Sequence, residues 1–264
     1  MLSELELLLL VISIIALVVA MVTIIIYYYY SRQRSNNYLE KEEQARLRYF
    51  IQETVGDHGQ VICYECLLRQ RNQNKWTLPG ELDVPLQRVI SLLEETFKSL
   101  PREQMRLSIN LEVSQILSPE FSYFVRWAIS KIDPMSLIIE YAPTGSLTRF
   151  TQRRLKSQIE QAQYYGMEFC IDDADATQEF YDRIEWLLPI TDQVKCVMDE
   201  FRKKDPTQWL DLNLQSWNKL AQKWNFEMIL TRVENPEDED LAQQLQIGEL
   251  QGYRFGKPKN PLID

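Results

Sequence analysis

A single apolar run fills the chain between residues 7 and 30 (LLLLVISIIALVVAMVTIIIYYYY). It contains no charged side chain, and only Ser13 and Thr23 bring hydroxyl groups into its interior. At about 1.5 Å per residue, a helix of this length spans the roughly 30 Å hydrocarbon core of a bilayer. The pattern predicts one transmembrane helix, preceded by a short extracytoplasmic segment of residues 1–6.

Two other kinds of segment share this pattern, a cleaved signal peptide and a buried core helix. A signal peptide begins with basic residues and has an apolar run of about 7–15 residues. This chain begins instead with Glu4 and Glu6, and its run is longer. A core helix that is apolar on every face needs a larger protein around it. We therefore favour the membrane anchor.

Charge on the two sides of the run predicts its orientation. No basic residue precedes it, and those that follow closely are Arg32, Arg34, Lys41, Arg46 and Arg48. The positive-inside rule then places the C-terminal side in the cytoplasm, as a single-pass protein of the cell membrane. The four tyrosines 27–30 fit the aromatic belt at the bilayer interface. The polar residues 31–46 predict a juxtamembrane linker that is helical in its second half.

After residue 46, short apolar runs rich in β-branched residues alternate with helical patterns. The alternation indicates an α/β domain over residues 47–264 with a mainly parallel sheet, either open and doubly wound or closed as a barrel. No Gly-rich phosphate loop follows the first strand, which argues against a dinucleotide-binding fold. Strands are expected at 60–69, 105–111, 136–142, 167–173, 193–198 and 226–233, and helices at 86–100, 149–166, 209–224 and 234–246.

Charge and cysteine content restrict the classes of function. A net charge of −9 disfavours non-specific binding to nucleic acid. Cys63 and Cys66 have the C-x-x-C spacing of redox and zinc sites. On the expected strand, however, residues three apart point to opposite faces, and no second cysteine or histidine pair completes a metal site. We interpret them as buried structural residues. The single histidine, His58, argues against a histidine-based triad.

Polar residues recur within or near the ends of five successive predicted strands. In a parallel barrel, the C-terminal ends of the strands meet at the mouth where barrel enzymes keep their active sites. Carboxylate and amide oxygens suit Mg²⁺ or Mn²⁺ better than zinc, and a lysine beside them can neutralise charge. The pattern therefore predicts a metal-dependent hydrolase. The residues are Glu65, Asn110, Glu140, Asp172, Asp173 and Lys195.

Several segments, in order, resemble the EAL domain family, the cyclic di-GMP phosphodiesterases. Residues 65–69 (ECLLR) are similar to the family's Glu-Ala-Leu-Leu-Arg signature, and residues 250–258 (LQGYRFGKP) to its closing segment. Between them, the segments at 108–111 (SINL), 139–140 (IE), 166–173 (GMEFCIDD), 194–195 (VK) and 233–234 (VE) match family strands. Upstream, Gln52 matches the family's Gln-Pro strand.

The resemblance implies a TIM-type (β/α)₈ barrel with an altered first strand. It also implies hydrolysis of cyclic di-GMP with one or two ions of Mg²⁺ or Mn²⁺, in which Lys195 positions the attacking water and Asp173 serves the second ion. The implied metal ligands are Glu65, Asn110, Glu140, Asp172 and Asp173. The implied nucleotide-binding residues are Gln52, Glu65, Leu67, Arg69 and Gln251.

The sequence departs from the family pattern at the site itself. Thr231 stands where the family has a glutamate, and Arg232 follows it. Pro143 replaces a second glutamate, Ala174-Asp175 replaces the Phe-Gly of a metal-site loop, and Val197 replaces an aspartate. A neutral hydroxyl and an added cation weaken a site for divalent cations. We therefore expect a degenerate member with little or no hydrolysis.

Three functions fit these residues. The first is a membrane-tethered receptor that binds cyclic di-GMP and signals to a protein partner or through a homodimer. The second is a working phosphodiesterase, in which Asp175 or Glu234 replaces the missing acid. The third is a protein-interaction module that is indifferent to the nucleotide. We rank the receptor first and the enzyme last.

Overall fold

The computed structural model describes residues 4–35, 47–73, 75–80, 84–202 and 210–262. The chain divides after residue 46 into two compact units. The first contains helix α1 (Glu4–Ser35), whose segment Leu7–Tyr27 is long and apolar enough to cross a membrane, a test that a signal sequence also passes. The helix continues through residues 31–35, which are the first residues of the predicted linker. The helix expected in the second half of the linker lies outside the described residues.

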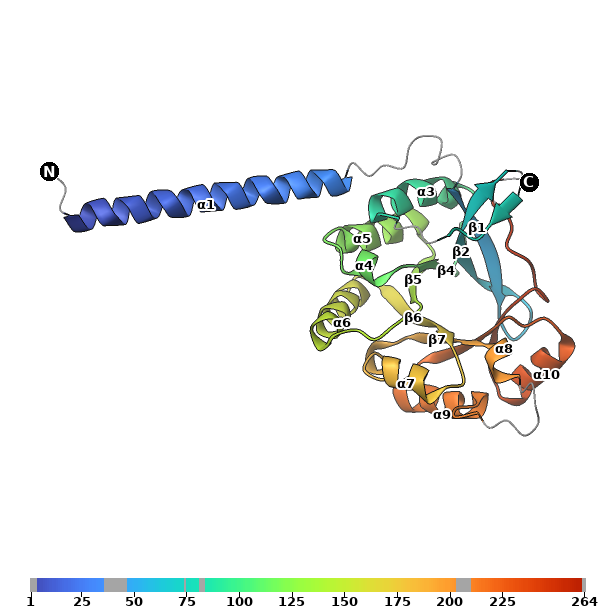
Figure 1. Cartoon of the computed structure of the whole chain (residues 1–264). Helices are drawn as coiled ribbons and strands as arrows, with labels where there is room; N and C mark the ends of the chain where they lie inside the picture. The colour runs from blue at the N-terminus through green and yellow to red at the C-terminus, as the bar shows by residue number, and fades with distance from the viewer. Residues whose placement is uncertain (1–3, 36–46, 74, 81–83, 203–209, 263–264) are drawn as a thin grey trace. The chain divides into compact units, whose positions relative to one another are not determined.

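The second unit is built around a closed barrel of eight strands (Figure 1). Neighbours in the barrel follow the order β1-β9-β8-β7-β6-β5-β4-β2, and pairing of β2 with β1 closes the ring, so the open-sheet alternative is wrong. The strands are β1 (Leu47–Val55), β2 (Val61–Asn72), β4 (Arg106–Asn110), β5 (Ser136–Tyr141), β6 (Met167–Ala174), β7 (Gln193–Val197), β8 (Glu227–Thr231) and β9 (Glu249–Gln251). A short strand, β3 (Lys75–Thr77), extends β2 outside the ring.

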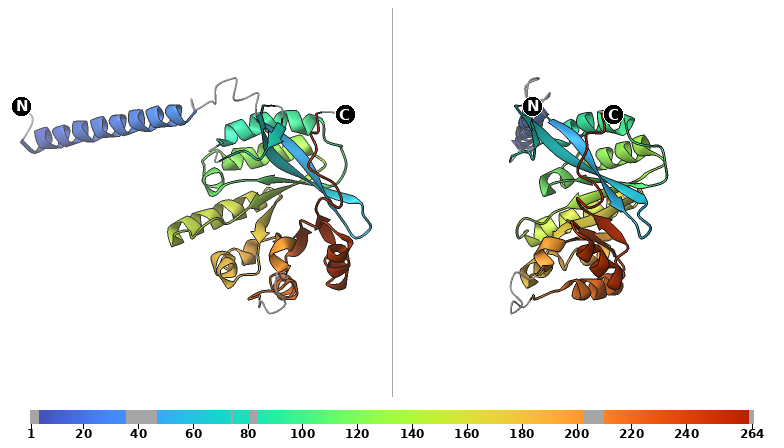
Figure 2. Two further views of the ribbon diagram at one scale, coloured as in Figure 1. Left: turned by 45° about the vertical axis from the view of Figure 1, so that its right-hand side comes forward. Right: turned by 90° about the vertical axis from the view of Figure 1, so that its right-hand side faces the viewer.

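The first strand of the barrel runs against the others. β1 pairs antiparallel with both β2 and β9, whereas the remaining neighbours in the ring pair in parallel. The long β1–β2 hairpin is visible along one side of the barrel in both views of Figure 2. The altered first strand implied by the family resemblance is therefore confirmed.

Helices cover the outer face of the parallel strands. They are α3 (Leu86–Lys98), α4 (Val113–Ile116), α5 (Phe121–Ile132), α6 (Arg149–Gln163), α7 (Gln178–Ile184), α8 (Met198–Phe201), α9 (Leu214–Trp224) and α10 (Pro236–Gln244), with a 3₁₀ turn η1 at Leu188–Ile190. Helix α6 buries Leu155, Ile159 and Ala162, one stripe at helical spacing. Between α3 and α5, the rings of Phe97 and Trp127 stack with centroids 5.5 Å apart.

The sequence determines several helix ends through local hydrogen bonds. The Thr148 hydroxyl accepts a bond from the amide of Thr151 and caps α6. The Asn235 side chain caps α10 in the same way, and Pro236 follows it at the first helical position. Gly166, which ends the turn after α6, has φ +95°, a conformation that glycine adopts without a steric cost.

All six predicted strands and all four predicted helices are present. The strand patterns missed are those of β1, β3 and β9. The two last are only three residues long, and β1 alternates too irregularly between buried and half-buried positions for a clear period of two. Helices α4, α5, α7 and α8 were also not predicted: α4 and α8 have only four residues and α7 seven, too few for a clear helical period, whereas α5 was missed although it has 12.

We predict that Gly252→Ala destabilises the barrel next to the site. A Cβ atom at residue 252 would overlap backbone atoms of Val233, which cannot move aside as a side-chain tip can. The expected loss of unfolding free energy is at least about 2 kcal/mol, measured by urea denaturation. The matched control is Gly145→Ala, because open space surrounds a Cβ there. Equal stability of the two variants would contradict the close approach of β9 to the segment after β8.

Candidate functional site

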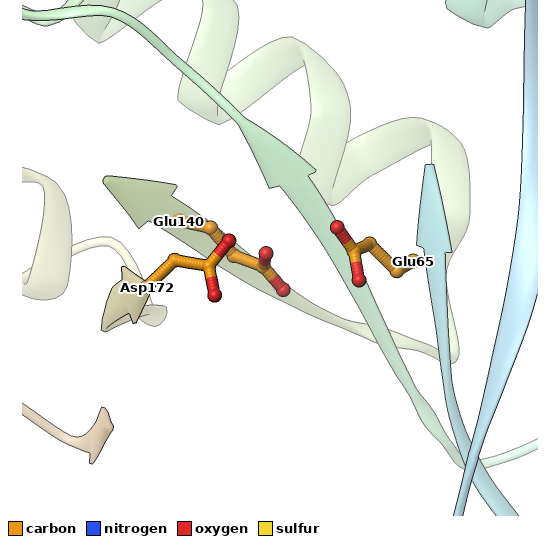
Figure 3. A group of neighbouring side chains, drawn as sticks. All are labelled: Glu65, Glu140 and Asp172. Carbon is orange, nitrogen blue, oxygen red and sulfur yellow. The ribbon is translucent and has the colours of Figure 1, made fainter. Parts of the chain in front are cut away.

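The interior of the barrel carries charge at its C-terminal mouth. Side chains alternate along each strand, so Cys63, Ile138 and Cys170 form a buried apolar cluster one level below the mouth. Two residues further along the same three strands stand Glu65, Glu140 and Asp172, the residues expected to converge there. Their carboxylate oxygens lie within 4.8 Å of one another, and Figure 3 shows the three groups turned together.

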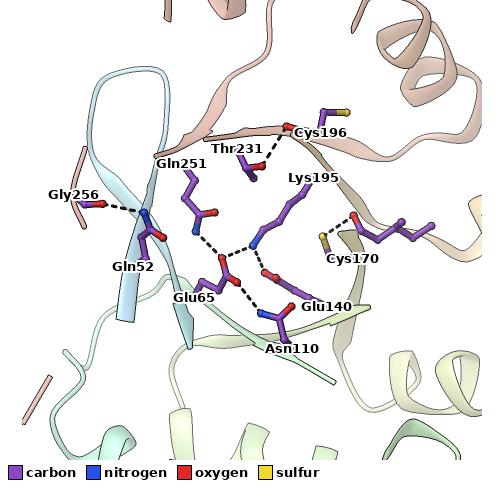
Figure 4. A network of polar contacts seen from close by, with 11 residues as sticks. Gln52, Glu65, Asn110, Glu140, Cys170, Lys195, Cys196, Thr231, Gln251 and Gly256 are labelled. Carbon is purple, nitrogen blue, oxygen red and sulfur yellow. Dashed lines mark hydrogen bonds and ion pairs between the residues drawn. The ribbon is translucent and has the colours of Figure 1, made fainter. Parts of the chain in front are cut away.

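Lys195 from β7 stands in the middle of this group (Figure 4). Its Nζ lies 2.8 Å from Glu65 Oε2 and 2.5 Å from Glu140 Oε1. All three side chains are buried, with exposed side-chain fractions of 3%, 7% and 0% respectively. One ammonium therefore compensates two carboxylates in a largely buried place.

Two amides complete the environment of Glu65. Asn110 Nδ2 donates to its Oε1 at 2.7 Å, and Gln251 Nε2 donates to its Oε2 at 2.8 Å. Gln52 lies nearby on β1 and donates to the carbonyl of Gly256 at 3.0 Å (Figure 4). The signature glutamate is thus hydrogen-bonded from three strands, which fixes its orientation.

Protonation of the three acids follows from this geometry. Burial acts to raise the pKa of Glu65, but the charge and hydrogen bonds of Lys195, Gln251 and Asn110 together lower it below its usual value. Burial and the neighbouring charge of Glu65 raise the pKa of Glu140 to about 8. Burial, opposed by Lys195, raises the pKa of Asp172 to about 6. The raised pKa values of Glu140 and Asp172 indicate that Lys195 alone does not compensate the charge of all three acids.

The same acids fit a divalent cation. The donors are all oxygens, as Mg²⁺ and Mn²⁺ prefer. Oε2 of Glu140 is fully buried and has no hydrogen-bond partner among the described residues, and an ion between the acids would satisfy it. Asn110 donates to Glu65 through Nδ2, which leaves its Oδ1 free to bind an ion, and Asp173 is exposed and outside the three-acid group. A metal site would thus rest mainly on Glu65, Glu140 and Asp172.

A pocket of about 430 Å³ opens beside the acid cluster. The five residues predicted to bind nucleotide all line it, together with Asp172 and Asp173. Those five are Gln52, Glu65, Leu67, Arg69 and Gln251. The structure therefore brings together residues that are up to 199 positions apart along the chain, and their roles stay predictions. The lining also includes Asp199 and Tyr253, which the sequence did not single out as site residues, and Arg232, which it identified only as a cation that weakens the metal site.

The residues that depart from the family pattern lie in different surroundings. The hydroxyl of Thr231 lines the pocket and lies 3.4 Å from the Cys196 carbonyl. Glu234 also lines the pocket. Asp175, in contrast, accepts hydrogen bonds from the amide and hydroxyl of Thr177 at 2.8 and 2.7 Å, in the turn that begins α7. It is not among the residues that line the pocket, and its replacement of the missing acid stays a prediction.

The four cysteines are free and buried. Cys63 faces the barrel interior with Ile138 and Cys170, and burial raises its pKa to about 12. The pKa of Cys66 is raised well above its usual value, again by burial. Protonated, enclosed thiols are poor nucleophiles and poor metal ligands. The interpretation of the C-x-x-C pair as structural is confirmed.

Comparison with known proteins agrees with the fold. The family model described as "EAL domain" matches residues 41–258. The chain belongs to the EAL domain family. A curated relative, the cyclic di-GMP phosphodiesterase PdeF of Escherichia coli, is 26% identical over 229 residues, which are 81% of this chain and 30% of PdeF. The chain thus spans less than a third of the length of that relative.

Solved structures share the barrel. An EAL domain protein from Listeria monocytogenes superposes with a TM-score of 0.66 at 17% identity, covering 84% of this chain and 95% of that one. The YkuI protein of Bacillus subtilis, solved with cyclic di-GMP and calcium, gives a TM-score of 0.65 at 14% identity, covering 84% and 57%. At such low identities, these similarities support the fold alone.

We predict that Lys195→Met destabilises the EAL domain and that Mn²⁺ offsets the loss. Removing the ammonium leaves Glu65 and Glu140 buried together without a cation, at an expected cost of about 3–5 kcal/mol. Thermal melts in EDTA and in excess Mn²⁺ measure both effects. Lys219→Met, on the exposed face of α9, is the control and should match the unmodified protein. Equal stability of both variants in EDTA would contradict the compensating role of Lys195.

Proposed function

We propose that this protein is a membrane-anchored cyclic di-GMP receptor of the EAL family, with little or no hydrolytic activity. The observation that carries the proposal is the pocket in which Arg69 stands beside the bonded network of Glu65. The names of the relatives support the choice of ligand: PdeF is a cyclic di-GMP phosphodiesterase, and YkuI was solved with cyclic di-GMP.

Arg69 is the residue best placed to hold a phosphate. It is half-buried at the pocket wall, and no carboxylate forms an ion pair with it within the described parts of the chain. One guanidinium nitrogen donates to the Leu68 carbonyl at 2.9 Å, which holds the group in place. A guanidinium has five N–H donors, so the others remain for a ligand. A charged planar donor of this kind suits a bidentate bond to phosphate.

The same geometry supports the second part of the proposal, that the domain hydrolyses the nucleotide slowly or not at all. When bound, a divalent ion would activate water and stabilise charge on the phosphate oxygens, and Glu65, Glu140 and Asp172 are the residues that would hold it. Lys195 already binds two of these acids, and its ammonium has to share them with any ion. Thr231 adds a neutral hydroxyl where a carboxylate would strengthen the site. We infer that the domain binds its nucleotide better than it cleaves it.

Helix α1 supports the placement of this receptor at a membrane. We propose that residues 7–30 cross the bilayer once, with residues 31–46 as the linker and the EAL domain on the cytoplasmic side, as the basic residues after the run favour. A ligand-induced change in the EAL domain would then reach a protein partner or a second copy close to the membrane surface.

We predict that the full-length protein in detergent binds cyclic di-GMP and that Arg69→Ala weakens the binding at least tenfold. A lost charge-assisted bond to phosphate typically costs about 1.5–3 kcal/mol. Calorimetric titration with Ca²⁺ present gives the dissociation constants. The control is Arg71→Ala, because Arg71 lies on the same strand but is exposed and does not line the pocket.

The two variants separate nucleotide binding from the nucleotide-independent interaction module. Saturable binding that Arg69→Ala weakens and Arg71→Ala does not is the result expected of a receptor. No heat at any accessible nucleotide concentration would overturn the proposal and favour the nucleotide-independent interaction module.

We predict that Thr231→Glu raises hydrolysis of cyclic di-GMP in Mn²⁺ by at least tenfold. The substitution adds a carboxylate to the pocket wall next to the acid cluster, and an additional anionic oxygen ligand strengthens a divalent-cation site. Chromatographic assay of the linear dinucleotide measures the rate. Thr231→Gln, of the same size without the charge, should stay at the basal rate. A Thr231→Glu rate no higher than that of Thr231→Gln would show that the missing acid is not what limits turnover.

A further inference from the structure

Arg232 occupies an unusual position at the rim of the pocket. It follows the last residue of β8, and its backbone has φ +57°, in the left-handed region. That conformation costs an ordinary L-residue roughly 1–2 kcal/mol, whereas glycine adopts it freely. Arg232 therefore occupies a backbone conformation that favours glycine. It places a long cationic side chain at the end of β8, in the lining of the pocket.

The side chain of Arg232 is only loosely held. It is 56% exposed, and its contact with an acid is 3.7 Å from Nη1 to Asp199 Oδ2, which is too long for a hydrogen bond. Asp199 is engaged more closely by Arg202, which also binds Asp238. The guanidinium of Arg232 therefore has donors free to meet a ligand.

The balance of charge in the pocket lining indicates what Arg232 could bind. The residues that line the pocket include five acids and two cations, and the cations are Arg69 and Arg232. Lys195 does not line the pocket, and its ammonium already forms ion pairs with Glu65 and Glu140. Because acids outnumber cations in this lining, binding of a ligand with two phosphates depends on these two guanidinium groups lying against it. The five acids are Glu65, Asp172, Asp173, Asp199 and Glu234.

We propose that Arg232 binds a phosphate of the ligand, so that the pocket holds an anionic cyclic dinucleotide without a divalent ion. Arg69 binds from β2 and Arg232 from the end of β8, and the two guanidinium groups supply the positive charge that a metal centre would otherwise provide. The inference rests on the proposed receptor function and adds a residue to it that the resemblance to the family does not imply.

The test is titration of cyclic di-GMP in EDTA into the full-length protein and four variants. Arg232→Ala removes the guanidinium and keeps the strained backbone. Arg232→Gly removes both, and it should melt within about 2 °C of the unmodified protein, because relief of strain offsets the freer unfolded chain. Arg254→Ala is the matched control: Arg254 pairs with Glu239 at 2.9 Å and does not line the pocket.

The expected result is that both Arg232 variants bind at least tenfold more weakly in EDTA, with Arg254→Ala within twofold of the unmodified protein. Arg232→Lys should restore part of the loss, because it keeps the charge without the planar fork. Arg232 variants that bind as well as the control would overturn this inference and leave the receptor function standing. No binding by the unmodified protein, in EDTA or in Ca²⁺, would overturn both.

Discussion

The ammonium of Lys195 holds together two carboxylates that would repel each other inside the barrel. Glu65 and Glu140 lie 2.8 and 2.5 Å from it, on strands that are separated in the ring by β4, and Lys195 reaches them from β7 across the interior. Buried charges are tolerated only where partners compensate them. The polar mouth of this barrel therefore depends on a single cation supplied by the chain itself.

That arrangement connects the fold to the function. Because Lys195 and the amides of Asn110 and Gln251 satisfy Glu65, the signature glutamate keeps a defined orientation. The pocket wall that includes Arg69 is built on the same strand. Under the proposed function, this wall would bind nucleotide while the metal centre is weak. Catalysis needs more, since it requires acids free to hold an ion, and Lys195 competes for two of them.

Much of this could be predicted from the sequence. Dense apolar runs predict the parallel strands. Polar residues near the strand ends, such as Glu140 and Asp172, locate the mouth of the barrel. Strand β1 could not be identified by its pattern, since its burial follows from antiparallel pairing with two distant segments. The family resemblance supplied Gln52 on that strand. No local pattern predicts a contact over such a separation.

Two details of the site depended on geometry that the sequence does not encode locally. Asp175 follows two acids, and the sequence suggests it as a replacement ligand. In the structure its carboxylate accepts hydrogen bonds from Thr177 in a turn, and the residue does not line the pocket. Arg232 looked merely disruptive next to Thr231. Its left-handed backbone and loose contact with Asp199 show instead a cation exposed at the pocket rim.

We propose that the EAL domain binds cyclic di-GMP and keeps it intact rather than hydrolysing it. The most direct measurement is a single-turnover experiment in Mn²⁺, with full-length protein in excess over cyclic di-GMP and chromatographic analysis of protein-bound and free nucleotide. The account predicts that intact cyclic di-GMP stays with the protein for hours. Rapid conversion of the bound nucleotide to the linear dinucleotide would contradict it.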